Sequence, residues 1–305
     1  MVNFAKKNLK ETRSLVYLLV ILAVAFWGGS YVWTKVLFEY YGPITIMFFR
    51  LGISTVLVFG LFRKMIQKID PKDYVAFFLL SFFSPFCYFL GESFGLLHVS
   101  PIVASVIIAT IPLFTPWLGI FAFGEKVSFA NILGFIVSFC GILVMVLDAD
   151  LRLAASPLGL ALLFLAVLSA LINIVFLKKL TLKYSSFTII STQNFLGVLF
   201  FLPFFLLLDL RSVITIMPSP TAIAAILALA VFGSTLAFMF YTSGVRVLGI
   251  ARTSIFTNLI PVVTAIFSVA ILGETLTPDK LLGMGIVIGG LLLTQVTRKL
   301  STQKT

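Results

Sequence analysis

The chain has 305 residues, of which 60% are hydrophobic and only 11% are charged. Soluble domains are about 45–50% apolar and about 25% charged, so this composition excludes a water-soluble globular fold. The formal charge of +11 does not indicate nucleic-acid binding, because Lys and Arg gather in short loops and at the two tails. With a single histidine and no metal-ligand spacing, we expect no metal site, no cofactor and no nucleic-acid partner.

The first apolar run covers residues 15–38 and follows Lys6, Lys7, Lys10 and Arg13. A basic segment before an apolar run is also typical of a signal peptide, whose apolar region has about 7–15 residues. This run is longer, and further apolar runs follow it. We therefore interpret it as a retained first transmembrane helix.

Apolar runs bounded by charged residues, Pro and Gly recur along the rest of the chain. A helix of roughly 20 apolar residues crosses a bilayer core of ~30 Å, and these runs are continuous, unlike the alternating strands of a membrane β-barrel. The sequence predicts an all-α integral membrane protein with ten transmembrane helices, at 15–38, 43–62, 74–97, 101–123, 129–147, 157–178, 186–208, 219–244, 250–272 and 279–297.

Basic residues are distributed unevenly when the loops are assigned alternately to the two sides. One side collects Lys6, Lys7, Lys10, Arg13, Arg63, Lys64, Lys68, Lys72, Lys126, Lys178, Lys179, Lys183, Arg246, Arg252, Arg298, Lys299 and Lys304. The other side has only Arg152, Arg211 and Lys280. Because cytoplasmic loops carry the excess of Lys and Arg, we expect both termini in the cytoplasm, with tails at 1–14 and 298–305.

An internal repeat divides the chain into halves at 15–147 and 157–297. At an offset of 149 residues, matched landmarks are Gly95 and Gly244, Ser105 and Ser254, Pro112 and Pro261, Gly124-Glu125 and Gly273-Glu274, Gly134 and Gly283, and Gly141 and Gly290. At an offset of 143, Lys35 matches Lys178, Thr45 matches Thr188, and Arg50 matches Gln193. Five helices per copy is an odd number, so the second copy enters from the opposite face. Such inverted repeats are typical of secondary transporters.

These landmarks together resemble the drug/metabolite transporter superfamily, specifically its ten-helix EamA-type members. The resemblance covers residues 15–297. It rests on Trp27-Gly28-Gly29-Ser30, Lys35, Arg50, Pro112, Gly124-Glu125, Pro261 and Gly273-Glu274. It implies a secondary transporter of small metabolites, often an exporter of amino acids or related compounds. The superfamily also transports sugars, nucleotide derivatives and drugs.

One face of the first helix carries Trp27, Ser30, Tyr31 and Thr34, which are spaced i, i+3, i+4, i+7. A polar and aromatic stripe is unfavourable against lipid, so it faces the interior of the bundle. It either lines a substrate cavity or closes a helix interface with its small and hydroxyl residues. We take Trp27, Ser30 and Tyr31 as candidate substrate contacts.

Further polar residues within the predicted spans are candidate substrate contacts, with interhelical hydrogen bonding as the alternative. They are Asn173, the repeat-mate of Ser30; Asn258, which precedes Pro261; and Thr110, Gln193 and Tyr241. Pro112 and Pro261 lie within predicted helices, where proline kinks or breaks the hydrogen-bond ladder. They are candidate hinges or cavity-shaping residues, or simply tolerated kinks.

Glu92 and Arg50 are ionisable residues inside predicted spans. Placing Arg near the bilayer centre costs about 2.5–3.5 kcal/mol on insertion scales, so a partner or water is expected, and Glu92 lies at a suitable depth. Glu92 either couples protons or binds a substrate amine, or the two residues are explained by a structural ion pair or by snorkelling to the membrane surface. Lys35 and Glu39 are one helical turn apart and are expected to pair.

Secondary active transport of a small organic metabolite is the leading functional prediction. No Walker-type phosphate loop occurs, which argues against ATP-driven transport. A membrane enzyme would need a cluster of His, Asp or Cys at one face, and a channel would need a pore ring; neither pattern is found, and no catalytic residue is assigned. We expect a monomer or homodimer in a bacterial inner membrane.

Overall fold

The computed structural model describes residues 2–114, 129–147, 155–215 and 219–301. Gly124, Glu125 and Lys126, and the first part of the connection between the predicted halves, lie outside the described residues. Helices make up almost all of the described chain, and no strand occurs within it. The all-helical class predicted from composition is therefore confirmed for the described ranges.

The described residues of the first predicted half form a series of helices. They are α1 (Val2–Leu37), α2 (Pro43–Phe62), η1 (Arg63–Met65), η2 (Pro71–Asp73), α3 (Tyr74–Ser81), the π-helical η3 (Phe82–Cys87), α4 (Tyr88–His98), α5 (Pro101–Ile108) and α7 (Phe129–Val146). Helix α1 begins at Val2, so the predicted N-terminal tail is helical and continuous with the first span.

The described residues of the second predicted half form a second series of helices. Its elements are α8 (Pro157–Thr181), α9 (Ser186–Phe204), the π-helical η4 (Phe205–Asp209), α10 (Leu210–Thr215), α11 (Pro220–Ala228), the π-helical η5 (Leu229–Leu236), α12 (Ala237–Leu248), α13 (Ile250–Thr253), the 3₁₀-helical η6 (Ser254–Leu259), α14 (Ile260–Leu272) and α15 (Pro278–Ser301).

Six helical stretches among the described residues are long and apolar enough to cross a membrane. They are Ser14–Leu37, Pro43–Met65, Pro71–His98, Pro157–Thr181, Ser186–Asp209 and Pro220–Leu248. Shorter apolar helices occupy Pro101–Phe114, Ile132–Val146 and Phe256–Leu272, and α15 covers the last predicted span. These findings establish an integral membrane protein, and the count of ten crossings stays a prediction.

Three helices begin with the same local signal, a serine followed by proline. Ser100, Ser156 and Ser219 each accept a hydrogen bond from the backbone N–H three residues later. Serine satisfies one of the free N–H groups at a helix start, and proline has no N–H to leave unpaired at the first helical position. The chain therefore starts these helices sharply after short loops.

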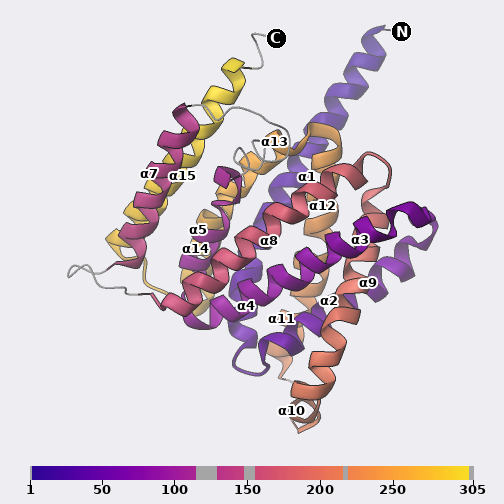
Figure 1. Cartoon of the computed structure of the whole chain (residues 1–305), viewed down its shortest axis with the longest axis vertical. Coiled ribbons are helices and arrows are strands. Elements are labelled where there is room, and N and C mark those ends of the chain that lie inside the picture. The colour runs from indigo at the N-terminus through magenta and orange to yellow at the C-terminus, as the bar shows by residue number, and fades with distance from the viewer. Residues whose placement is uncertain (1, 115–128, 148–154, 216–218, 302–305) are drawn as a thin grey trace.

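Helices α7 and α15 form a closely packed pair that lies beside the other helices (Figure 1). A Cβ added to Gly141 would lie 2.7 Å from the backbone oxygen of Gly283, and one added to Gly290 would lie 2.6 Å from that of Gly134. Ser138 donates a hydrogen bond to the carbonyl oxygen of Val287 at 3.1 Å. Only glycine allows the two backbones to approach this closely.

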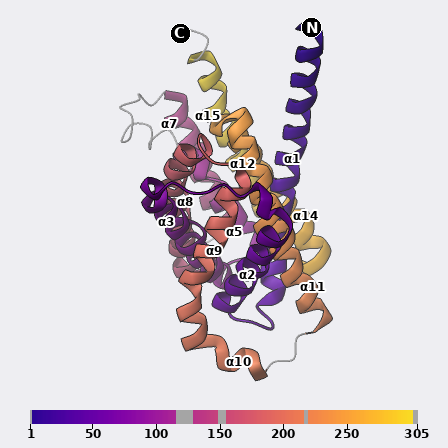
Figure 2. The same ribbon diagram turned by 90° about the vertical axis from the view of Figure 1, so that its right-hand side faces the viewer.

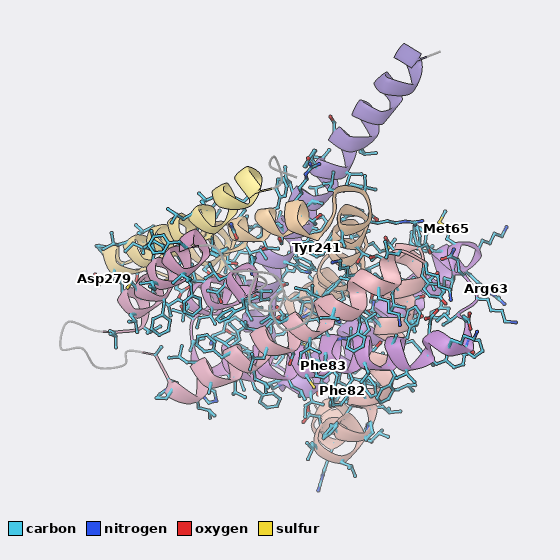
Figure 3. All side chains as sticks on the ribbon, turned by 45° about the horizontal axis from the view of Figure 1, so that its top comes forward. Arg63, Met65, Phe82, Phe83, Tyr241 and Asp279 are labelled. Carbon is cyan, nitrogen blue, oxygen red and sulfur yellow. The ribbon has the colours of Figure 1, made fainter. Side chains whose placement is uncertain are left out.

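The first turns of α1 and the last turns of α15 lie at the same end of the molecule, as Figures 1 and 2 show. Figure 3 places Arg63 and Met65 on one side of the view and Asp279 on the opposite side. An even number of membrane crossings would place the two ends of the chain at the same end of the molecule, as is seen for α1 and α15.

Two connections are joined by a polar cluster at the ends of long apolar spans, which we call the loop clamp: Gln67, Asp70, Asp73, Lys183, Tyr184 and Ser185. Lys183 Nζ lies 3.2 Å from an Asp70 carboxylate oxygen and 2.6 Å from one of Asp73. Tyr184 also donates to Asp73 at 2.7 Å, and the backbone N–H of Ser185 donates to Gln67 at 2.6 Å. The clamp ties the α2–α3 connection to the α8–α9 connection.

The predicted pairing of Lys35 with Glu39 is wrong. Lys35 Nζ instead donates to the backbone oxygens of Leu96, at 2.9 Å, and Val99, at 3.4 Å. These carbonyls lie at the C-terminal end of α4, where carbonyl groups lack partners in the helix and attract a cation. The Lys35 ammonium therefore donates to carbonyl groups at the end of α4 and does not pair with the exposed carboxylate of Glu39.

Candidate functional site

A cavity of about 130 Å³ lies among the helices, between segments far apart in the sequence. A dry cavity of about 150 Å³ is known to hold a benzene molecule, so the space fits a small organic group. Its described lining residues are Trp27, Ser30, Tyr31, Arg50, Ser84, Tyr88, Phe89, Glu92, Ile108, Ile111, Pro112, Ala170, Asn173, Ile174, Leu177, Gln193, Phe238, Tyr241, Thr242, Ser254, Thr257 and Ile260. Both predicted halves contribute to the wall.

A break in the third span shapes one part of the wall. Ser84 has extended backbone angles (φ −149°, ψ 122°) inside η3, before Pro85. The break frees backbone carbonyl groups, which must find other partners away from water. Asn173 donates to the carbonyl oxygen of Leu80 at 2.7 Å, and Gln193 donates to that of Ser84 at 2.9 Å. These two amides therefore stabilise the broken helix, while their side chains also line the cavity.

Arg50 is the only Lys or Arg among the described lining residues of this cavity. It is 2% exposed, donates from Nε to the hydroxyl of Ser234 at 2.7 Å, and lies with its guanidinium carbon 4.3 Å from the centre of the Phe89 ring. A cation over an aromatic face is stabilised by the ring's quadrupole. These contacts satisfy one edge of the guanidinium and leave its two Nη atoms without a hydrogen-bond partner among the described residues.

Glu92 lines the same cavity from α4. Its carboxylate accepts a hydrogen bond of 2.7 Å from the hydroxyl of Tyr88, one turn earlier, and Tyr31 of α1 lines the same cavity. No salt bridge joins Glu92 to Arg50 in the described part of the chain, although both line the same cavity. The structural ion pair considered from the sequence is therefore not formed in this structure.

Aromatic rings form another part of the wall. The Trp27 ring lies 5.0 Å from that of Phe238 in an edge-on arrangement and 4.9 Å from that of Tyr241, between centroids. Figure 3 shows Tyr241 in the middle of the bundle. Aromatic pairs at these distances are mutually stabilising, so the rings form an apolar part of a wall that also holds charged and amide groups.

Most of the residues predicted as substrate contacts lie around this cavity. They are Trp27, Ser30, Tyr31, Glu92, Asn173, Gln193 and Tyr241, together with Arg50. Thr110 does not line it; its hydroxyl donates to the Ile107 carbonyl within its own helix. Asn258 does not line it either, and its amide is buried without a described partner.

The two candidate hinge prolines differ in position. Pro112 lines the cavity, just after a turn at residues 109–110 interrupts the α-helix. Pro261 does not line it and lies in the first turn of α14, directly after the 3₁₀-helical η6. Whether either proline acts as a hinge stays a prediction.

Several lining residues are not among the candidates predicted from the sequence, including Ser84, Tyr88, Thr242 and Thr257. Tyr88 could have been found, because it precedes Glu92 by four residues and therefore shares its helical face. Ser84 could also have been found, because Pro85 lies inside the predicted span 74–97, where proline breaks the helical ladder and favours extended backbone at the residue before it. Thr242 lies one residue from Tyr241, and predicting its orientation requires the exact helical phase.

Comparison with known proteins matches the model of the EamA-like transporter family to residues 14–147 and again to residues 157–296. The chain belongs to this family. The resemblance drawn from the sequence motifs is thereby confirmed, and the protein is an EamA-type transporter.

Relatives of this EamA-type transporter cover nearly all of its length. A protein of Archaeoglobus fulgidus described as an uncharacterized transporter is 28% identical, over 93% of this chain and 99% of its own. A Bacillus subtilis protein, the uncharacterized transporter YetK, is 26% identical over 93% and 87%. An Escherichia coli protein described as a probable amino-acid metabolite efflux pump is 25% identical over 90% and 92%.

A solved crystal structure shares the fold, with a TM-score of 0.65 over 94% of this chain and 99% of that chain. The sequence identity is 16%, so the likeness supports the fold alone.

Proposed function

We propose that this EamA-type transporter is a secondary active exporter of amino acids or related zwitterionic compounds. The observation that supports this most is the separation of Arg50 and Glu92 in one cavity, without an ion pair between them. Charges inside a membrane protein are costly unless they are paired or solvated. A zwitterion would pair with both, its carboxylate with Arg50 and its ammonium with Glu92.

The aromatic part of the cavity favours an apolar or aromatic substituent on that substrate. Trp27, Phe238 and Tyr241 offer ring faces and edges, and the space of about 130 Å³ is close to that which holds a benzene ring. Sites for drug-sized ligands are about 300–1,000 Å³, so this cavity suits a nucleotide derivative or drug less well. The amino-acid relative in Escherichia coli points the same way.

Alternating access between two inverted repeats is the mechanism we propose. Contacts at matched positions support it: Gly141 meets Gly283 as Gly290 meets Gly134, at an offset of 149. A Cβ on Gly95 would meet Leu163, and one on the matched Gly244 would meet Val20, the position matched to Leu163 at an offset of 143. Contacts that recur after exchange of the halves are those expected about a pseudo-two-fold axis.

The proposed location is a bacterial inner membrane with both termini in the cytoplasm, as a monomer or homodimer. The helices that carry the two termini approach one end of the molecule. Arg63, in a loop predicted to be cytoplasmic, lies on the opposite side of the view from Asp279, which precedes the last span (Figure 3). The excess of Lys and Arg on one side supports this orientation.

Counterflow in proteoliposomes tests the proposal. Vesicles holding the purified chain and loaded with unlabelled L-phenylalanine should accumulate labelled L-phenylalanine transiently and saturably, and Arg50→Ala should abolish this accumulation. A channel would equilibrate the label without accumulating it, and an enzyme would change its chemical form. Counterflow of a nucleotide sugar with none of phenylalanine would establish the alternative substrate class.

A further inference from the structure

The guanidinium of Arg50 is held from the other half of the molecule. Arg50 lies on α2, and the hydroxyl that accepts from its Nε, at 2.7 Å, belongs to Ser234 on η5. Ser234 is fully buried and does not line the cavity. A residue of this kind can act on a ligand only through the arginine.

Ser234 is itself fixed by a buried polar network. Asn194 of α9 donates to the backbone oxygen of Ser234 at 3.3 Å and to the hydroxyl of Ser54 at 2.7 Å. The side-chain hydroxyl of Thr235 donates to the backbone oxygen of Ala230, five residues earlier in the π-helical η5, at 2.8 Å. The helix irregularity and this network together orient the Ser234 hydroxyl toward Arg50.

The neighbouring residue Gly233 leaves room for the guanidinium. A Cβ added to Gly233 would lie 3.3 Å from Arg50 Nη2 and 3.4 Å from the Cβ of Ser30. A larger residue at position 233 would press on Nη2, one of the two guanidinium nitrogens that lack a hydrogen-bond partner among the described residues. The segment Gly233-Ser234 therefore supports the guanidinium on one side and leaves its two Nη atoms for a ligand.

The corresponding place in the other half contains no charge. Gln193 donates to the backbone oxygen of Ser84. Gln193 matches Arg50 at the offset of 143, and Ser84 matches Gly233 at the offset of 149. In both places a long side chain from the second helix of one copy contacts the broken helix of the other copy. The single arginine makes the cavity electrostatically asymmetric, and its orientation decides where a substrate anion binds.

We propose that Ser234 is a positioning residue that holds the Arg50 guanidinium with both Nη atoms toward the cavity, and so sets the affinity for the carboxylate of the substrate. This proposal rests on the proposed function, in which Arg50 binds that carboxylate. Two parallel N–H groups bind a carboxylate in a bidentate manner only when their plane is fixed, and a guanidinium fixed in advance loses less entropy on binding.

The test compares two ligands that differ in the carboxylate alone. Binding of L-phenylalanine and of phenethylamine, which keeps the ring and the ammonium, is measured with the purified full-length chain. Ser234→Ala should raise the Kd for L-phenylalanine about tenfold, the scale of a lost hydrogen bond to a charged group. The Kd for phenethylamine should stay within about twofold of the native value.

Ser105→Ala is the matched control, because Ser105 is equally buried and its hydroxyl donates only to Ile102 of its own helix. It should leave both dissociation constants unchanged. Ser234→Cys replaces the alanine variant if that variant does not fold, since the slightly larger thiol fills the hydroxyl's place but accepts hydrogen bonds weakly. Equal weakening of both ligands, or weakening of neither, would overturn the positioning role.

A readout without substrate separates this proposal from the proposed function. The rate at which phenylglyoxal modifies Arg50, followed by mass spectrometry, should rise at least threefold in Ser234→Ala and stay constant in Ser105→Ala. If the native chain binds neither ligand, the substrate class is wrong while this rate still tests Ser234. An unchanged rate would contradict the positioning role whatever the substrate.

Discussion

At the scale of single residues, the cavity combines one carboxylate and one guanidinium that do not contact each other as an ion pair in the described structure. Glu92 accepts from Tyr88, and Arg50 donates to Ser234. Each charge is therefore partly satisfied and still available to a ligand. Such an arrangement binds a dipolar molecule better than it binds a simple ion.

Substitution of Glu92 by Gln tests the ammonium contact. The change keeps the shape and removes the negative charge, so affinity for L-phenylalanine and for phenethylamine should fall at least tenfold. If Glu92 also couples protons, the dependence of flux on a proton gradient should disappear. Counterflow and binding assays measure the two effects.

Glu39→Gln is the control for this change, because Glu39 is exposed, lies in the turn after α1 and does not line the cavity. Undiminished binding and pH-dependent flux in the Glu92 variant would dismiss both roles of this carboxylate.

Much of the site could be predicted from residue types alone. Polar and ionisable residues in an apolar span must face the protein interior. This rule alone predicts that Trp27, Tyr31, Glu92 and Asn173 are candidate cavity residues. Thr110 and Asn258 have the same chemistry but a different rotation about their helices. Thr110 lies in a turn that interrupts the α-helix, and Asn258 lies in the 3₁₀-helical η6. Regular α-helical spacing therefore misplaces both residues.

At the scale of helices, Pro85 marks the interruption of one span in the sequence, whereas the interruption at η5 has no such mark, because no proline follows Pro220 in that run. The predicted spans at 74–97 and 219–244 are interrupted at matched places by the π-helical η3 and η5. The side chains that hydrogen-bond to the backbone carbonyls freed at these interruptions lie on other helices. They therefore cannot be recognised from the interrupted apolar run alone. The helix starts were predictable, because Ser and Pro act locally.

The close packing of α7 on α15 is open to a direct test at this scale. Gly141→Ala places a Cβ 2.7 Å from a backbone oxygen of the facing helix, which must move. We expect destabilisation of about 1–3 kcal/mol, the usual cost of overpacking, seen as a lower Tm of the purified protein in detergent.

Gly285→Ala is the matched control, because a Cβ at Gly285 of α15 would meet nothing within 4 Å. It should leave the Tm unchanged or raise it slightly, since alanine favours helix over glycine. Equal Tm values for the two variants would mean that the backbone contact between α7 and α15 contributes nothing to stability.

At the scale of the whole molecule, the proposed antiparallel arrangement predicts on which side each loop lies. Arg63 and Arg211 follow the second helix of each copy, so they should lie on opposite faces, with Asp279 on the face of Arg211. In a chain with Cys87 and Cys140 replaced by alanine, an impermeant maleimide should label Arg211→Cys and Asp279→Cys in intact cells. Arg63→Cys should react only after permeabilisation.

The control is the cysteine-free chain, which should not react. Labelling of positions 63 and 211 from the same face would contradict the inverted arrangement, and a fully reversed pattern would contradict only the proposed orientation. Composition sufficed to predict the all-helical membrane class, whereas the orientation inferred from Lys and Arg stays a prediction. The closeness of α7 to α15 required the structure, because lipid-facing and helix-facing glycines have the same sequence signature.

The loop clamp has a consequence for how flux should respond to acidity. The backbone N–H of Lys72 and the ammonium of Lys183 lower the pKa of Asp70, so its stabilisation is lost only as the pH falls through that lowered value. Hydrogen bonding to Asp73 raises the pKa of Lys183, so its stabilisation is lost only as the pH rises through that raised value. Between the ordinary values, about 4 and 10, this link between the two connections keeps a constant charge. A change of transport rate with external or internal acidity across the physiological range therefore has its origin elsewhere in the protein than at this aqueous contact.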